Sequence, residues 1–334
     1  MKISEIRQKS IKSIKSAFLS SGSESLKSQA ETASLDVDVI ISHFTGRDRS
    51  WVLFHRDFEL DGETEKKIGA AVEKRKSGLP VAYITSHKEF YGLDFYVNPS
   101  VLIPKPDTEI LVDFAVDEIL DKYPASFSKN LPLYIPLVCD MCAGSGCIGL
   151  SVLKELEKRF SSQSGICSGG ENFLKSENLP KIVLADLSLD ALEVAKKNAQ
   201  ALLSGGLQRR VRFVQSNLFE QIPFVFDVIV TNPPYVPHSQ SVELLTDGRS
   251  EPLLALDGDV DENGNPSGSD DGLALIRRLV PECYAHLSKN GVLLMETGEY
   301  NAEATAELFK KAGFRNVHIE LDLSEKMRDV IGTK

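Results

Sequence analysis

The chain has 334 residues, of which 42% are hydrophobic and 26% are charged, and its formal net charge is −10. This composition predicts a globular chain long enough for two domains, and no apolar run approaches the length of a membrane span. Residues 1–100 hold 15 basic and 14 acidic side chains, so the remainder, with 23 basic and 34 acidic, carries the negative charge. An acidic surface suits a basic protein substrate better than the phosphates of a nucleic acid.

Helical periodicity dominates residues 1–85, where we expect a small helical domain. Four isoleucines near the N-terminus recur at the spacing of one helix face, and the segments 35–44 and 63–76 show the same pattern. Turn sequences at Ser20-Ser-Gly-Ser and Asp61-Gly separate these segments. The Ser- and Lys-rich start contains an acid and lacks an apolar core, which argues against a targeting peptide and for a cytoplasmic protein.

A linker over residues 86–106 is expected to join this domain to a second one, residues 107–334. Alternating side chains from Tyr91 to Leu102 predict a hairpin. Asp107 is a suitable N-cap for a helix that continues to about Leu120.

Strands and helices alternate from residue 137 onward, which predicts an α/β fold with a doubly wound, mostly parallel sheet. Two segments, 161–180 and 259–271, are rich in small and polar residues and are expected to be surface loops without a chemical role. The expected strands and helices are, in order, 137–140, a helix to 159, 181–186, a helix 190–203, 211–216, 226–231, a helix 273–287, 291–296, a helix 302–311, and strands near 317 and 330.

A glycine-containing turn follows the first of these strands. Its sequence, Asp140-Met-Cys142-Ala143-Gly144-Ser145-Gly146, brings backbone N–H groups and a helix N-terminus close to a ligand, because a side chain at either glycine would block the approach. The turn alone fits several nucleotide cofactors, although Cys142 stands where a dinucleotide fingerprint would have its first glycine.

Polar residues also end the next two strands. Asp186 is placed to accept hydrogen bonds from two ribose hydroxyls, or to cap the helix that begins near Leu189. Asn217 could bond an adenine edge while Leu218 or Phe219 covers its face, and a loop asparagine beside a core phenylalanine is the alternative.

The stretch Asn232-Pro233-Pro234-Tyr235 follows the apolar run 226–231, where a buried strand should end at a pocket. The Asn232 side-chain carbonyl and the Pro233 backbone carbonyl can each accept one N–H of a planar nitrogen, which is a poor nucleophile and needs orientation. Two prolines stiffen the turn, and Tyr235 offers a flat wall. Methyl transfer to an amide or amino nitrogen is one interpretation, and a merely rigid turn is the other.

The order of these motifs resembles the class I S-adenosylmethionine-dependent methyltransferases. The chain is still more similar to the HemK/PrmC-type protein-(glutamine-N5) methyltransferases, and the resemblance covers nearly all of it. The stretches that carry this closer similarity are Pro80-Val-Ala-Tyr-Ile-Thr with Glu89-Phe-Tyr-Gly-Leu-Asp-Phe, Leu102-Ile-Pro-Lys-Pro-Asp107-Thr-Glu109, and Glu251-Pro-Leu-Leu-Ala-Leu-Asp-Gly258.

The resemblance implies a Rossmann-like sheet of seven strands with an antiparallel last strand, and an N-terminal domain that recognises the substrate. It implies S-adenosyl-L-methionine as methyl donor, no metal, and class I peptide chain release factors as partners, methylated at the glutamine of their Gly-Gly-Gln motif in support of translation termination. A monomer is expected. The implied catalytic residues are Asn232, Pro233, Pro234 and Tyr235, and the implied cofactor-binding residues are Asp140, Cys142, Ala143, Gly144, Ser145, Gly146, Asp186, Asn217, Leu218 and Asn232.

The chain departs from the family pattern at three places, none of them in the methyl-accepting motif. Lys105 replaces the usual arginine between two prolines, Ser86 replaces a common glycine, and Leu218 stands where some members have an aromatic residue. A glutamine methyltransferase of a ribosomal protein, an N6-adenine methyltransferase of nucleic acid, and a non-catalytic protein on the same fold are the alternatives.

Other potential chemical groups have simpler interpretations. The five cysteines lack the four converging ligands of a structural zinc site and are expected to be small apolar fillers. His238 is expected at the rim of the site and not as a catalytic base.

Overall fold

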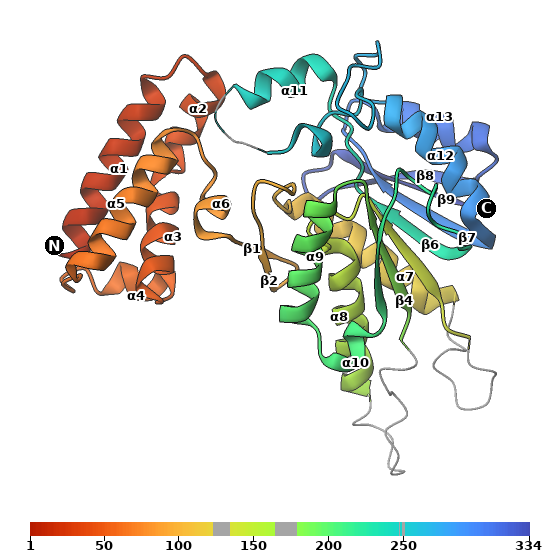
Figure 1. Ribbon diagram of the computed structural model, residues 1–334, viewed down its shortest axis with the longest axis horizontal. Helices are drawn as coiled ribbons and strands as arrows, with labels where there is room; N and C mark the ends of the chain where they lie inside the picture. The colour runs from red at the N-terminus through yellow and green to blue at the C-terminus, as the bar shows by residue number, and fades with distance from the viewer. Residues whose placement is uncertain (123–133, 164–178, 247, 249–250) are drawn as a thin grey trace. The chain divides into compact units, whose positions relative to one another are not determined.

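We describe the chain from a computed structural model, which places residues 1–122, 134–163, 179–246, 248 and 251–334. The chain forms two compact units. The first comprises Met1–His87 and Val242–Glu251, and the second comprises Lys88–Ser241 and Pro252–Lys334. Figure 1 labels the helices and strands of both.

The first unit is helical and has its own hydrophobic core. Phe18, Ile40 and Ile68 are fully buried among its helices. Asp61, the first residue of the predicted Asp61-Gly turn, caps one of them by accepting hydrogen bonds from the backbone N–H groups of Glu63 and Thr64. The helices are α1 (Ile3–Leu19), α2 (Glu24–Ser28), η1 (Gln29–Glu31), α3 (Ala33–Thr45), α4 (Arg49–Phe54), α5 (Gly62–Lys76) and α6 (Val81–Thr85).

A short hairpin precedes the main sheet, four residues earlier than predicted. Its strands are β1 (His87–Phe90) and β2 (Leu93–Tyr96). Tyr91 and Gly92, expected inside the first strand, form the turn and have φ angles of 53° and 71°. A two-residue hairpin turn of this kind needs positive φ at both positions, which the glycine favours.

Asp107 is not an N-cap, contrary to the sequence-based prediction. It lies within the 3₁₀ turn η2 (Pro106–Thr108), which runs directly into α7 (Glu109–Lys122). Its carboxylate accepts a hydrogen bond from Arg328 at 3.3 Å instead. The preceding proline sets the turn in place of a side-chain cap.

Seven strands form one sheet in the order β5-β4-β3-β6-β7-β9-β8. The strands β3 to β7 are parallel, whereas β9 lies between β7 and β8 and is antiparallel to both. The predicted doubly wound α/β fold with an antiparallel last strand is confirmed. The remaining elements are β3 (Leu137–Met141), α8 (Cys147–Gln163), β4 (Lys181–Asp186), α9 (Leu189–Leu202), α10 (Gly205–Gln208), β5 (Val211–Gln215), β6 (Phe226–Thr231), α11 (His238–Leu245), η5 (Leu253–Ala255), α12 (Ala274–His286), β7 (Leu287–Glu296), α13 (Ala302–Ala312), β8 (Arg315–Leu321) and β9 (Met327–Thr333).

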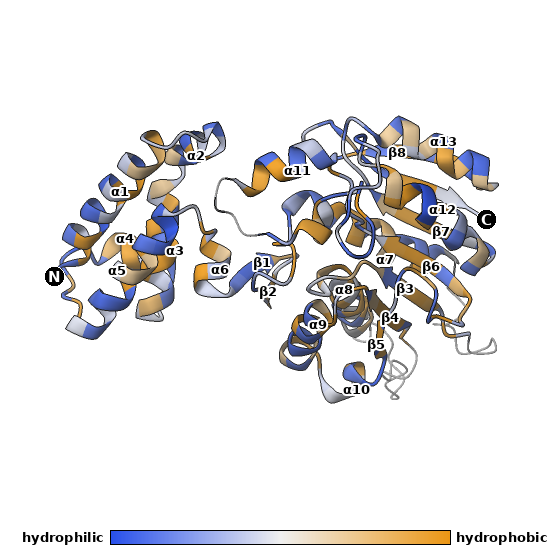
Figure 2. Cartoon of the chain, turned by 45° about the horizontal axis from the view of Figure 1, so that its top comes forward, coloured by the Kyte–Doolittle hydropathy of each residue, from blue (hydrophilic) through white to orange (hydrophobic). Residues whose placement is uncertain are grey.

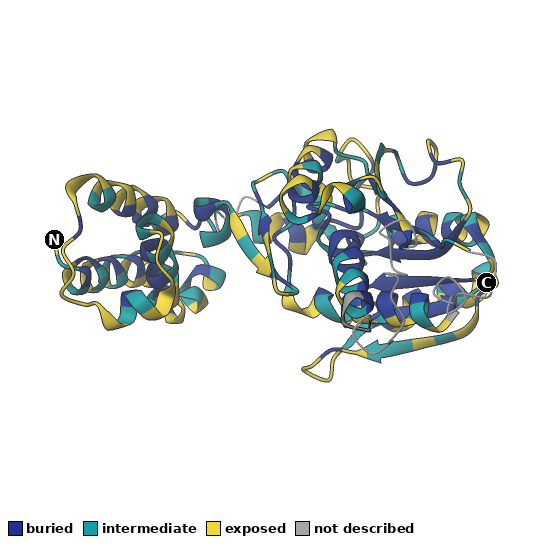
Figure 3. Cartoon of the chain, turned by 90° about the horizontal axis from the view of Figure 1, so that it is seen from below, coloured by how far each residue is buried: buried dark blue, intermediate teal, exposed yellow. Residues whose placement is uncertain are grey.

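Helices cover both faces of this sheet, and consecutive strand residues pack on opposite faces. Val138 and Val228 pack with the α7, α8 and α9 side chains, whereas Cys139 and Ile229 pack with those of α12 and α13. The central strands are therefore apolar along their length and buried, as Figures 2 and 3 show. Each such aliphatic side chain contributes about 1.5–3 kcal/mol by leaving water, and the sheet is a rigid base for the loops at its edge.

Of the two segments expected to be surface loops, residues 161–180 lie for the most part outside the described residues. The other, 259–271, belongs to the site described next.

Candidate active site

A cavity opens in the second unit at the carboxyl ends of β3, β4 and β6. The chain runs outward from β3 through β4 to β5 and then returns to β6 on the other side of β3, which makes this edge the topological switch point where open α/β sheets bind ligands. The lining includes Ser100, Val101, Leu102, Pro104, Lys105, Thr108, Cys142, Ala143, Gly144, Ser145, Cys147, Asp186, Asn217, Leu218, Asn232, Pro234, Asp257, Val260, Asp261 and Glu262.

The glycine-containing turn forms one wall of the cavity. Cys142, Gly144 and Gly146 all have positive φ, at 60°, 53° and 75°. A Cβ added to Gly144 would meet nothing within 4 Å, whereas one added to Gly146 would lie 3.2 Å from Leu150. Gly144 therefore leaves space on the cavity side, and Gly146 lets the turn pack closely on its own helix.

Asp140 lies behind this turn and not in the cavity lining. It is completely buried, and its Oδ2 accepts a 2.8 Å hydrogen bond from the Gly149 backbone N–H. A Cβ at Gly149 would lie 2.6 Å from Leu184, so this third glycine is needed where α8 crosses the sheet. Burial raises the pKa of Asp140 to about 7. The structure thus places Asp140 as a support of the turn.

Asp186 ends β4 with its carboxylate at the cavity. Oδ2 accepts a 2.8 Å hydrogen bond from the Gly144 N–H, and Oδ1 accepts one of 2.9 Å from Ser188 N–H. Burial raises the pKa of Asp186, while these backbone donors oppose the shift. Ser188, and not Asp186, caps α9 by accepting from Ala191 N–H. The Asp186 carboxylate is thus oriented from behind and keeps lone pairs for hydroxyl donors in the cavity.

The residues 217–219, which follow β5, differ in whether they can contact a ligand in the cavity. Leu218, with φ 50°, lines the cavity and presents an apolar side chain there. Asn217 also lines it, but its amide donates to Glu220 at 3.0 Å and accepts from Arg278 at 3.4 Å. Phe219 is buried in the core, with its ring stacked on His286. Of the two residues predicted to cover a planar ring, Leu218 is therefore better placed than Phe219.

The segment between the hairpin and α7 lies along the cavity. Five of its residues, from Ser100 to Lys105, belong to the lining, followed by Thr108. The linker therefore forms part of the cavity wall.

Asn232 follows β6 directly and lines the cavity with Pro234. The Asn232 Nδ2 donates a 3.2 Å hydrogen bond to Thr108 Oγ1, and within the described part of the chain its Oδ1 accepts none. Pro233 and Tyr235 are not part of the lining. Their expected contacts with a substrate stay predictions.

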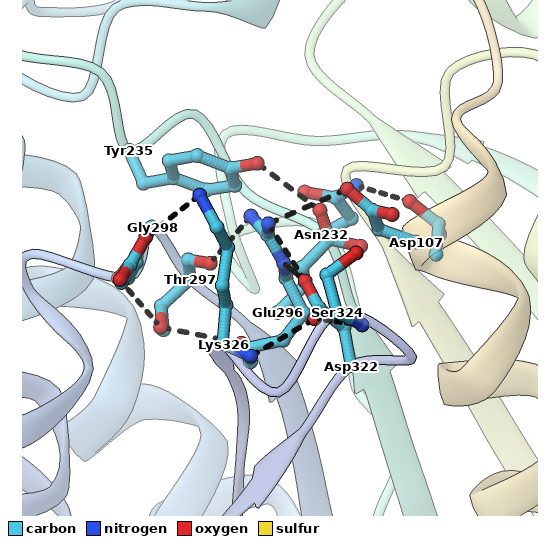
Figure 4. Close-up of polar contacts among 12 residues, drawn as sticks. Asp107, Asn232, Tyr235, Glu296, Thr297, Gly298, Asp322, Ser324 and Lys326 are labelled. Atoms are coloured by element: carbon cyan, nitrogen blue, oxygen red, sulfur yellow. Dashed lines mark hydrogen bonds and ion pairs between the residues drawn. The ribbon is translucent and has the colours of Figure 1, made fainter.

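The Tyr235 side chain points to a buried acidic group, shown in Figure 4. Its hydroxyl donates to Glu296 Oε1 at 3.1 Å, and Glu296 is only 1% exposed. Asp329 lies directly opposite Glu296 on the neighbouring strand. Burial raises the pKa of both carboxyls, to about 8 for Asp329. Arg328 provides the nearby positive charge and lowers both pKa values against this trend.

The loop 259–271 lies at the surface for most of its length, as predicted, but its first residue is buried and supports the region around the Asn232 turn. Asp259 is fully buried and accepts hydrogen bonds from the N–H groups of Gly272 and Ala274. A Cβ on Gly272 would stand 2.0 Å from the Tyr235 carbonyl oxygen. The acidic composition of this loop therefore satisfies backbone donors, and Asp261 and Glu262 contribute to the cavity wall.

The Tyr235 carbonyl is also fixed from the other side. It accepts hydrogen bonds from Asn301 Nδ2 at 3.1 Å and from the Tyr300 hydroxyl at 3.2 Å. The backbone of the Asn232 turn is thus preorganised before any ligand binds.

The remaining candidate groups have structural roles. His238 contacts Asp257 through Nδ1 at 2.6 Å and is not part of the lining. Cys139 and Cys283 are buried, and burial raises the pKa of the cavity-lining Cys147 to about 12. No cluster of three metal-ligating side chains occurs among the described residues, and none of the described helices is long and apolar enough to cross a membrane.

Sequence reasoning missed two residues behind the site, Thr108 and Glu296. Both carried a signal. Thr108 lies in the stretch 102–109 that carries the family resemblance, and Glu296 ends a parallel strand as Asp186 does.

Known proteins match this chain along most of its length. A family model described as "PrmC N-terminal domain" matches residues 17–85, and one described as "Methyltransferase small domain" matches residues 164–248. The release factor glutamine methyltransferase of Leptospira interrogans is 35% identical and that of Haemophilus influenzae 32% identical, each over 92% of this chain and 93% of the relative. Among solved structures, a methyltransferase from Pyrococcus furiosus is 16% identical, with a TM-score of 0.43, over 80% of this chain and 97% of its own. The chain belongs to the release factor glutamine methyltransferase family.

Proposed function

We propose that the protein transfers a methyl group from S-adenosyl-L-methionine to the side-chain amide nitrogen of the glutamine in the Gly-Gly-Gln motif of class I release factors. The observation that carries the proposal is the position of Asn232 in the wall of the cavity that the glycine turn and Asp186 also line. The names of the curated relatives support the substrate class.

The cavity residues fit a nucleoside-type methyl donor. Gly144 leaves open space where a side chain would stand, Asp186 offers carboxylate oxygens to ribose hydroxyls, and Leu218 offers an apolar surface to a base. When bound, S-adenosylmethionine supplies a methyl group on a positively charged sulfur. The protein has to hold and orient its two ligands and exclude water from between them.

Asn232 supplies the orientation of the acceptor. An amide nitrogen has its lone pair delocalised into the carbonyl group, so its reactivity depends on how its plane is held. The Asn232 Oδ1 can accept one N–H of the substrate, and the Pro233 carbonyl is the second acceptor that the family resemblance implies. No histidine lines the cavity among the described residues, and the proton lost on methylation can pass to water without a dedicated base.

The two parts of the chain are proposed to divide the task. Residues 1–85 recognise the release factor, residues 86–106 link and cover the cofactor, and residues 107–334 carry out the transfer. The excess of acidic residues beyond residue 100 favours a basic protein partner. Release factors work on ribosomes, which places the activity in the cytoplasm.

Incubation of the purified protein with radiolabelled S-adenosylmethionine and a class I release factor tests the proposal. We expect one methyl group per release factor, and none when the glutamine of its Gly-Gly-Gln motif is replaced by alanine. The Asn232→Ala variant should lose at least about 2 kcal/mol of transition-state stabilisation, a factor of about 30 in kcat/KM. Labelling of a ribosomal protein, DNA or RNA in place of the release factor would refute the assignment.

A further inference from the structure

A buried chain of side chains leads from the cavity wall into the protein core behind Asn232. Asn232 Nδ2 donates to Thr108 Oγ1 at 3.2 Å. Thr108 is 2% exposed and Glu296 is 1% exposed, so water does not compete with their contacts. The Tyr235 hydroxyl donates to Glu296 Oε1, and within the described residues Glu296 Oε2 has no hydrogen-bond partner. The Thr108 hydroxyl also interacts with the Glu296 carboxyl and favours its ionised form. Figure 4 shows Asn232, Tyr235 and Glu296 close to one another.

The direction of these hydrogen bonds follows from which groups can donate. The Thr108 hydroxyl accepts from Asn232 Nδ2, so its one proton is left for another acceptor, and the Glu296 carboxyl is the group on which it acts. The hydroxyl oxygen can then only accept from Asn232, which excludes the rotated amide that would place Oδ1 against Thr108. Burial raises the pKa of Glu296, while Thr108, Tyr235 and Arg328 oppose this shift, and burial raises the pKa of the neighbouring Asp329 to about 8.

The orientation of this amide matters because its two ends are nearly equal in size and opposite in polarity. With Nδ2 held by Thr108, Oδ1 is left for the cavity, where it can accept an N–H of a glutamine side chain. Rotation by half a turn would present N–H groups instead, which repel a substrate N–H and attract a carboxylate.

We propose that Glu296 and Thr108 are positioning residues that fix the Asn232 amide with Oδ1 toward the substrate, and thereby make the site select glutamine over glutamate. This inference rests on the proposed glutamine methylation.

The test compares four variants with the wild type. Thr108→Val removes the hydroxyl at nearly constant volume, and Thr108→Ser retains it. Glu296→Gln keeps the shape and an acceptor for Tyr235, but its amide can donate to Thr108 and so release the hydroxyl proton toward Asn232. Thr305→Val is the matched control, because Thr305 is also fully buried and, among the described residues, its hydroxyl bonds only the backbone carbonyl of Asn301, the residue before α13.

Two sets of measurements are made for each variant: the first gives kcat and KM with a release factor, and the second gives the affinities for that factor and for its Gln→Glu form. Melting temperature and S-adenosylmethionine affinity serve as controls for folding. Thr108→Val and Glu296→Gln should lower kcat at least about tenfold with little change in KM, and lower the preference for the glutamine form at least about fivefold. Thr108→Ser should restore both quantities, and Thr305→Val should change neither.

The outcomes separate the two proposals. A wild type that labels no release factor refutes the proposed function. Given an active wild type, unchanged kcat in Thr108→Val, equal loss in Thr108→Val and Thr108→Ser, or a fall in kcat with an unchanged glutamine preference refutes the positioning role. If Thr108→Val does not fold, wild-type values in Glu296→Gln refute it in the same way.

Discussion

Asp329 is a carboxylic acid buried without a hydrogen-bond partner. Within the described residues neither of its carboxyl oxygens has a hydrogen-bond partner. Asp329 lies opposite Glu296 on the neighbouring strand. Removal from water penalises its ionised form, which raises its pKa from 3.8 to about 8. The folded protein therefore keeps a proton on Asp329 over a pH range in which the unfolded chain has lost it.

This difference makes the stability fall as the pH rises from about 4 to about 8, because the folded state binds more protons there. Asp329→Asn should remove the contribution. The free energy of unfolding of the variant, relative to the wild type, should rise by at least about 2 kcal/mol between pH 4 and pH 9. Urea unfolding at several pH values measures it.

Asp190→Asn is the control, since Asp190 is exposed in the first turn of α9. The free energy of unfolding of this variant, plotted against pH, should run parallel to that of the wild type. Parallel curves for Asp329→Asn as well would show that Asp329 is already ionised in the folded protein.

At the scale of elements, the loop 259–271 and the Asn232 turn depend on one another. Gly272 has a φ of 72°, and its Cα approaches the Tyr235 carbonyl so closely that a Cβ would stand 2.0 Å from that oxygen. The carbonyl cannot move away freely, because Asn301 and Tyr300 hold it. A methyl group at Gly272 should therefore displace the turn that carries Asn232.

Gly272→Ala is expected to lower kcat at least about tenfold while the protein remains folded. Gly264→Ala is the matched control, because Gly264 also has a positive φ, 80°, but no atom lies within 4 Å of its added Cβ. This control bears only the cost of the left-handed conformation, about 1 kcal/mol, and should keep its activity. Steady-state kinetics and thermal melting of both variants check the prediction, and equal activity of the two would contradict it.

The elements most visible in the sequence were those whose signals are local. The strands after residue 137 are short apolar runs, and the turn at Gly144 is marked by its own composition. The contact of Asn232 with Thr108 joins residues 124 positions apart, and no local pattern encodes it. The supporting role of Asp259 in the acidic loop was missed for a related reason, since its carboxylate is satisfied by backbone N–H groups 13 and 15 positions away.

At the scale of the whole molecule, the two units have separate hydrophobic cores. The buried residues of the helical unit, such as Ile40, form one cluster, and those on the two faces of the sheet form two others. A substitution in one core should therefore act mainly on the stability of its own unit.

Ile40→Ala tests this separation. Loss of a fully buried isoleucine should cost about 2–5 kcal/mol in the helical unit and leave the affinity of the second unit for S-adenosylmethionine unchanged within about twofold. Differential scanning calorimetry would register the first effect, and titration calorimetry the second. A large loss of cofactor affinity would show that the two cores are energetically coupled.

The position of β9 has a consequence for biosynthesis. This strand is made after β7 and β8 but lies between them, so both strands keep an open row of backbone donors and acceptors until residues 327–333 have left the ribosome. Glu296 also stays hydrated until then, because the residue opposite it is on that strand. A nascent chain without β9 would have exposed, aggregation-prone strand edges. Its Glu296 would still be in contact with water and could not support Asn232, so pairing of β9 is the step that completes the site.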